Sequence, residues 1–93
     1  MQYPRIHING SSAESLLREY QRARLALADA LYALRNIDVN GRDYYVINSG
    51  AASIAMREHQ ERVAAIQRVL EDMTAIHENI TKQHDERQAS RAR

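Results

Sequence analysis

An apolar stripe along the second half of the chain constrains the fold more than any other feature. Its members alternate in steps of four and three residues: Ala52, Met56, His59, Val63, Ile66, Leu70, Met73, His77, Ile80 and His84. A mean period of about 3.5 residues is the a/d pattern of a helix that lies along another helix. The stripe therefore predicts an all-α fold in which the main contact is between long helices.

Two helices are predicted, at about residues 12–36 and 50–83, joined by a loop over 37–49. The first is expected to begin where Ser11 and Glu14 have the spacing of a capping box. Apolar residues then recur at steps of three and four along both segments, which is typical of amphipathic helices. The fold class we expect is an antiparallel two-helix hairpin that associates into a helical bundle.

The remaining segments are predicted from their turn and capping residues. The chain before the hairpin, residues 1–10, is expected to form an extended arm, because a residue before proline avoids the helical conformation. Gly41 is expected to adopt the left-handed conformation that ends many helices, and Asn48 or Ser49 is expected to cap the second helix. Residues 85–93 lack apolar periodicity, which predicts a basic, frayed tail.

A hairpin of these helices leaves apolar surface uncovered. The second helix is longer than the first by roughly 12 Å, so we expect it to overhang, with Ile80 uncovered at its end. Leu25, Tyr32, Val69 and Ile76 are expected on flanking faces. A second copy of the chain is the simplest cover for this surface. The expected oligomer interface is formed by Met56, Val63, Ile66, Leu70, Met73, His77 and Ile80.

Composition excludes several classes of protein. Cysteine is absent, which excludes disulfides and thiolate metal sites. No segment approaches the roughly 18 apolar residues of a membrane span, and residues 1–10 lack the apolar region of a secretory signal. The formal net charge of +1 is too balanced for a general polycation. We therefore expect a cytoplasmic protein without a membrane partner, and nucleic acid is not its expected partner.

The histidines do not have the spacing of a metal site. His77 and His84 are seven residues apart, about 10 Å along a helix, which is too far for two ligands of one ion. The sequence also lacks a nucleophile triad, a glycine-rich phosphate loop and a nucleotide fingerprint. We predict no enzymatic activity, no metal and no cofactor.

The loop between the helices carries the candidate ligand site. The start of a helix offers free backbone N–H groups to an anion, an arginine adds a planar fork, and a tyrosine ring stacks on a base. In the alternative interpretation the tyrosines plug the end of the bundle, while the arginine pairs with Asp38 or Asp43. The candidate ligand residues are Arg42, Tyr44, Tyr45 and Ser49.

Two segments of the chain resemble parts of a known group of proteins. Residues 3–10, Tyr-Pro-Arg-Ile-His-Ile-Asn-Gly, and 40–45, Asn-Gly-Arg-Asp-Tyr-Tyr, are similar to segments of small helical proteins of tailed bacteriophages and prophages. The resemblance covers about residues 3–80. It departs at 46–48, Val-Ile-Asn, where such proteins often carry Pro-Gln-Gly. It implies a phage accessory protein in the bacterial cytoplasm or in the virion, and no activity that transfers to a residue.

The expected function is therefore non-catalytic. We expect an oligomeric interaction protein that captures a host protein or an anionic nucleotide signal and so antagonises host defence. Two alternatives stay open at this point: a virion assembly or decoration protein, and a nucleic-acid-binding regulator.

Overall fold

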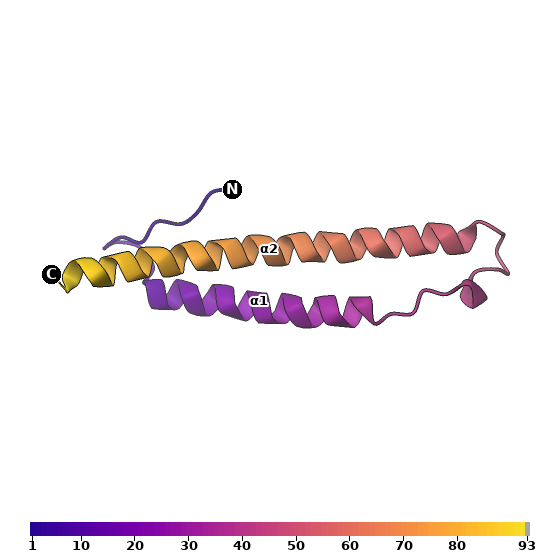
Figure 1. Cartoon of the computed structure of the whole chain (residues 1–93), viewed down its shortest axis with the longest axis horizontal. Helices are drawn as coiled ribbons and strands as arrows, with labels where there is room; N and C mark the ends of the chain where they lie inside the picture. Colours follow the sequence, from indigo (N-terminus) through magenta and orange to yellow (C-terminus); the bar gives the residue numbers. More distant parts are fainter. Residues whose placement is uncertain (93) are drawn as a thin grey trace.

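The computed structural model describes residues 1–92 as a hairpin of two antiparallel helices (Figure 1). The first helix is α1 (Ala13–Arg35) and the second is α2 (Ala51–Arg91), with the short 3-10 helix η1 (Gly41–Asp43) in the connection. The molecule is a rod with extents of 69 × 21 × 20 Å. The described residues contain no strand, which confirms the all-α hairpin. None of their helices is both long enough and apolar enough to cross a membrane.

The ends of α1 differ in detail from the predicted ones. Ser12, in extended conformation, is the N-cap, and its hydroxyl oxygen accepts the Ser15 N–H at 3.1 Å. The capping box predicted for Ser11 and Glu14 is therefore wrong, because Ser12 is the cap and the residue three after it is Ser15 rather than Glu or Gln. The helix ends at Arg35, and no residue of the described chain has a positive φ. The left-handed conformation predicted for Gly41 is wrong, because α1 has ended well before that glycine.

Helix α2 begins close to the predicted residue and continues beyond the predicted end. Gly50 is its N-cap without a side-chain cap, and Asn48 instead accepts the Gly50 N–H at 2.9 Å. At the other end α2 runs to Arg91, so the prediction of a frayed tail from residue 85 is wrong for the described residues. The apolar stripe ends near His84, but no glycine or proline follows it, and the intrinsic helix propensity of Glu, Arg, Gln and Ala continues the helix.

The register of the hairpin is set by a long connection rather than a tight turn. Residues 36–50 run beside the first turns of α2 before the chain reverses (Figure 1). As a result, Arg35 at the end of α1 donates through Nη2 to Oε1 of Gln67 at 3.1 Å. Gln67 lies about 24 Å along α2 from its start at Ala51. Helix α2 therefore extends beyond α1 at both ends (Figure 1), whereas the sequence predicted an overhang at its C-terminal end.

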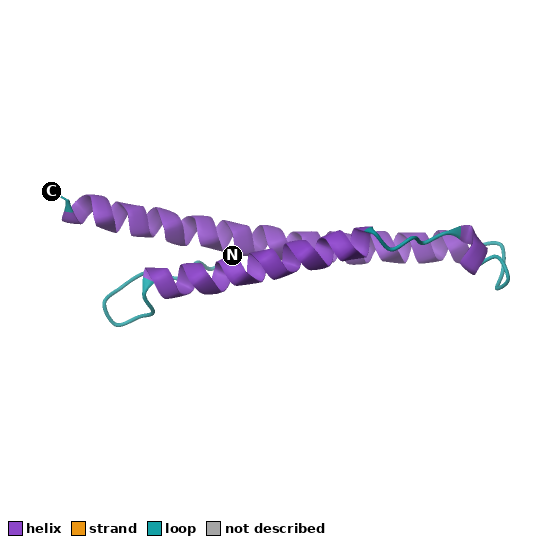
Figure 2. Cartoon of the chain, turned by 90° about the horizontal axis from the view of Figure 1, so that it is seen from below, coloured by secondary structure: helices purple, strands orange, loops and turns teal. Residues whose placement is uncertain are grey.

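The core lies at the other end of the rod, where α1 begins. The two helices diverge toward this end (Figure 2), and the N-terminal arm folds back there so that Ile6 packs against Ala13, Ile76 and Ile80. Ile80 is 0% exposed and Ile76 is 7% exposed. The predictions of an uncovered Ile80 and a flanking Ile76 are therefore wrong, because the arm covers both residues.

Most of the apolar stripe of α2 is half-buried in the single chain. These half-buried residues are Ala52, His59, Val63, Ile66, Leu70, Met73, His77 and His84. Leu31 of α1 is buried one turn before Arg35, which marks the same contact between the helices. The flanking side chains Leu25, Tyr32 and Val69 are exposed. Helix α1 covers one side of the stripe of α2 and leaves the edges of the stripe open to solvent.

Candidate functional site

The connection between the helices holds Arg42 within its own turn. The Asn40 side-chain oxygen accepts both the backbone N–H and the Nε–H of Arg42, at 2.9 and 3.2 Å. Nη2 of Arg42 lies 3.9 Å from Oδ2 of Asp38, and both side chains are highly exposed. This is one of the two ion pairs that the alternative interpretation of the loop named. An exposed pair of this kind contributes little to stability.

The other candidate residues of the loop are not brought to a common point by the hydrogen bonds of the described chain. Tyr44 is half-buried, whereas Tyr45 is 72% exposed and Ser49 is exposed. The N–H groups of both tyrosines donate to the Gly41 carbonyl, which fixes their backbone at the end of η1. Tyr45 therefore does not plug the end of the single hairpin. The four residues share one short segment, and their role as a ligand site stays a prediction.

A second set of polar residues, which the sequence did not single out, fastens the arm to α2. The side-chain amide of Gln83 donates to the Pro4 carbonyl at 2.8 Å and accepts the Ile6 N–H at 2.9 Å. Arg87 donates through Nη1 to the Ile6 carbonyl at 3.2 Å. Gln83 thus bonds the arm as a neighbouring strand would bond it. In the sequence, only the i, i+4 spacing of Gln83 and Arg87 indicated that these two side chains lie on one face of the helix.

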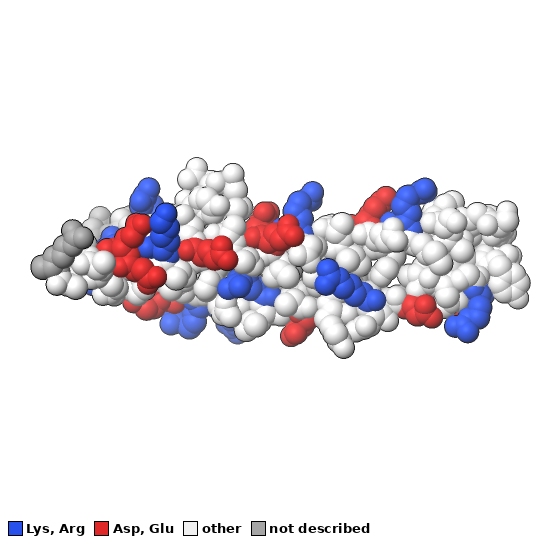
Figure 3. All heavy atoms as spheres, viewed as in Figure 1, with Lys and Arg blue, Asp and Glu red and all other residues white. Residues whose placement is uncertain are grey.

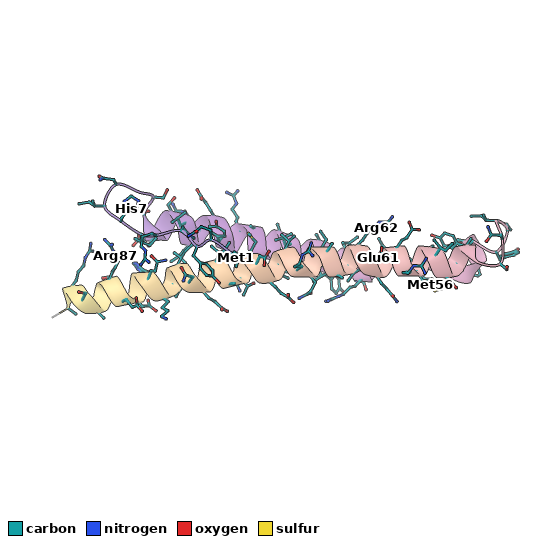
Figure 4. The ribbon with its side chains drawn as sticks, turned by 90° about the horizontal axis from the view of Figure 1, so that it is seen from above. Met1, His7, Met56, Glu61, Arg62 and Arg87 are labelled. Atoms are coloured by element: carbon teal, nitrogen blue, oxygen red, sulfur yellow. The ribbon has the colours of Figure 1, made fainter. Side chains whose placement is uncertain are left out.

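Beside this contact the arm and both helices enclose a cleft of about 230 Å³, which we call the arm-end cleft. Figure 4 shows Arg87 on the side of α2 that faces the turn carrying His7. The arm supplies that turn, α1 supplies its first turn, and α2 supplies its last turns. The lining residues are Ile6, His7, Ile8, Gly10, Ser11, Ser12, Ala13, Glu14, His84, Arg87, Gln88 and Arg91.

The turn of the arm holds the His7 ring in place. The Gly10 N–H donates to the His7 carbonyl at 3.1 Å, and the Asn9 N–H donates to His7 Nδ1 at 3.3 Å. An Nδ1 that accepts a hydrogen bond leaves the proton of the neutral ring on Nε2. A Cβ at position 10 would lie 2.7 Å from that Nε2. A larger residue at position 10 would therefore displace the exposed His7 ring.

Charge at this end of the rod comes from both helices. His84 Nε2 lies 3.9 Å from Oε1 of Glu14, which links the last turns of α2 to the first turn of α1. Arg87 and Arg91 add two permanent positive charges to the lining. On the face shown in Figure 3, acidic and basic side chains alternate along the rod, and the loop end carries few of them.

Two further observations concern titratable groups. Burial lowers the pKa of His77 below its usual value of 6.5, the nearby Arg24 lowers it further, and Glu78 opposes the shift. Within residues 1–92, no group of three or more His, Cys, Asp or Glu side chains could hold a metal ion.

Comparison with protein-family models, with curated proteins and with solved structures finds no match for this chain. The chain itself is a rod with a small core at one end, exposed apolar side chains in the loop at the other end and a polar cleft beside the core.

Proposed function

We propose that this chain is a non-catalytic binding protein that acts as a homo-oligomer, of the kind implied by its resemblance to small phage accessory proteins. The proposal is supported by one observation above all, the surface that the single chain leaves exposed.

That surface is too large for an independent domain of this mass. The chain has 7086 Å² of accessible surface, whereas a compact monomer of 10.7 kDa has about 5,500 Å². The excess of about 1,600 Å² is roughly twice the area that each partner contributes to a standard protein–protein interface. A second copy of the chain would cover an excess of this size.

The exposed apolar side chains concentrate at one end of the rod. Twelve large hydrophobic side chains are exposed, and six of them lie within residues 37–56, which we call the loop half. Charged side chains are scarce there: three of the twenty residues, compared with 27% of the whole chain. Depletion of charge is a mark of the centre of an interface. The six side chains are Ile37, Tyr45, Val46, Ile47, Ile54 and Met56.

The helix geometry also favours a second copy as the occupant of the loop half. The first turns of α2 are opposite the irregular residues 36–50, because α1 has already ended at Arg35. Another hairpin supplies a helix that packs on these turns, as in a four-helix bundle, and a two-fold dimer needs only one self-complementary patch. Met56, of the interface predicted from the sequence, lies in this patch, whereas the fully buried Ile80 has no surface left for a partner.

Sedimentation velocity of the purified chain at micromolar concentration tests the proposal. We expect a dimer or a larger closed oligomer for the natural sequence. The double variant Ile47→Glu/Ile54→Glu should be monomeric, because both side chains are exposed in the single chain and a charge there is costly only in an interface. The matched control, Leu25→Glu/Val69→Glu, changes two exposed apolar side chains outside the loop half and should remain oligomeric.

Circular dichroism of both double variants should show the helix content of the natural chain, since exposed substitutions change stability little. A natural chain that is a folded monomer would refute self-association. An oligomer that only the control variant dissociates would refute the placement of the interface at the loop half.

A further inference from the structure

We propose that the arm-end cleft binds the phosphate group of a small phosphate monoester. This inference goes beyond self-association, because the cleft is formed by one chain and lies at the end of the rod away from the loop half.

Two arginines of α2 supply the charge that such a group needs. Arg87 uses one of its five N–H donors on the Ile6 carbonyl, and the arm thereby holds its guanidinium against the cleft. Arg91 is one turn further on the same face and makes no hydrogen bond or ion pair with another described residue. Arginine forks bind two phosphate oxygens at once, so this pair suits a group with several terminal oxygens.

The opposite wall of the cleft adds neutral donors. The Ser12 hydroxyl and carbonyl accept the N–H groups of Ser15 and Leu16, which leaves the first N–H groups of α1, those of Ala13 and Glu14, without a partner in the described chain. Ala13 is 5% exposed, so its N–H is held in the wall by packing, whereas Glu14 is exposed. The exposed His7 ring lies on the third side, where the arm turns, with its Nε2 next to Gly10.

One residue of the lining opposes an anion. Glu14 carries a negative charge at the cleft, and its carboxylate lies 3.9 Å from His84 Nε2. The two arginines outweigh this single acid, so the lining remains positive even with both histidines neutral. The presence of Glu14 also provides a sharp test, because removing its charge should strengthen the binding of an anion.

The size of the cleft and the charge around it favour a small molecule. A volume of about 230 Å³ is below the roughly 300 Å³ at which pockets for drug-sized ligands begin, which suits a phosphate group with a short substituent. A nucleic-acid strand needs a continuous basic groove, whereas acidic and basic side chains alternate on the face of the rod shown in Figure 3. A monoester carries more charge than a diester and exposes one more terminal oxygen for the two arginines.

Titration of the ¹⁵N-labelled chain followed by NMR tests the proposal, with phenyl phosphate as the monoester and diphenyl phosphate as the diester. We expect saturable shifts of the Ala13 and Glu14 amides with phenyl phosphate. Arg91→Gln should weaken this binding about tenfold, as expected for the loss of one hydrogen bond to a charged group. Arg57→Gln, an exposed arginine about 50 Å away on the same helix, should leave the affinity unchanged, and Glu14→Gln should increase it several-fold.

Three results would overturn the proposal: no saturable shift with phenyl phosphate, equal weakening by Arg91→Gln and Arg57→Gln, or diphenyl phosphate binding as tightly as phenyl phosphate. The same titration on the Ile47→Glu/Ile54→Glu variant separates this inference from the proposed function. Binding should be unchanged in that variant, so loss of self-association and loss of the cleft's affinity are distinguishable.

Discussion

The replacement of Ile80 by alanine tests the arrangement of the core directly. Ile80 is 0% exposed, and it lies in the cluster where Ile6 from the arm and Ala13 from α1 meet α2. The variant removes three carbon atoms from a site enclosed by three separate segments. Buried Ile→Ala substitutions cost about 2–5 kcal/mol, in proportion to the cavity they leave. We expect a loss of about 3 kcal/mol, because neither the arm nor α1 can collapse into the space without losing its own contacts.

Leu25→Ala is the matched control. It removes the same number of carbon atoms from a helix, at a side chain that is 58% exposed, and should change the free energy of unfolding by less than about 1 kcal/mol. Urea denaturation followed by far-ultraviolet circular dichroism measures both variants, at one fixed protein concentration because self-association adds to apparent stability. For a domain of this size, the expected loss lowers the melting temperature by roughly 12–24 °C.

A small effect would refute the reasoning. If Ile80→Ala costs no more than Leu25→Ala, Ile80 lies on an uncovered overhang, as the helix lengths alone suggested. The docking of the arm on α2 would then be wrong, and the arm-end cleft would be wrong with it.

The remaining predictions concern the arm and His77 of the apolar stripe. Replacing Gln83 by leucine removes its two hydrogen bonds to the arm, so hydrogen-exchange NMR should show at least tenfold faster exchange of the Ile6 amide hydrogen. Unchanged exchange would mean that the Gln83 hydrogen bonds do not hold the arm. Because burial lowers the pKa of His77 in the folded chain, with Arg24 as the second cause, the unfolded chain binds a proton more readily. The contribution of His77 to the stability of the fold is therefore present above about pH 6.5 and is lost as the pH falls toward the lowered pKa. Denaturation curves at several pH values should show this loss in the natural chain and a smaller one in His77→Gln; equal losses would contradict it.

The helices themselves could be predicted from the sequence, because their signals are local. The steps of four and three from Ala52 onward indicate a helix that packs along another helix, and α2 spans all of these residues. The exposed flanking positions Leu25, Tyr32 and Val69 also followed from helical periodicity. The pairing of Arg42 with Asp38 was one of the two partners that local spacing allowed.

The register of the hairpin and the site beside its core could not be predicted in this way. Helix lengths say that α2 overhangs α1, but how the overhang is divided between the two ends depends on the path of residues 36–50, which carry no periodic pattern. The burial of Ile80 and the cleft lined by Arg87 depend on a contact with the arm across more than seventy residues. Side-chain spacing along a helix determines which face is apolar, whereas only the folded chain determines which segment covers that face.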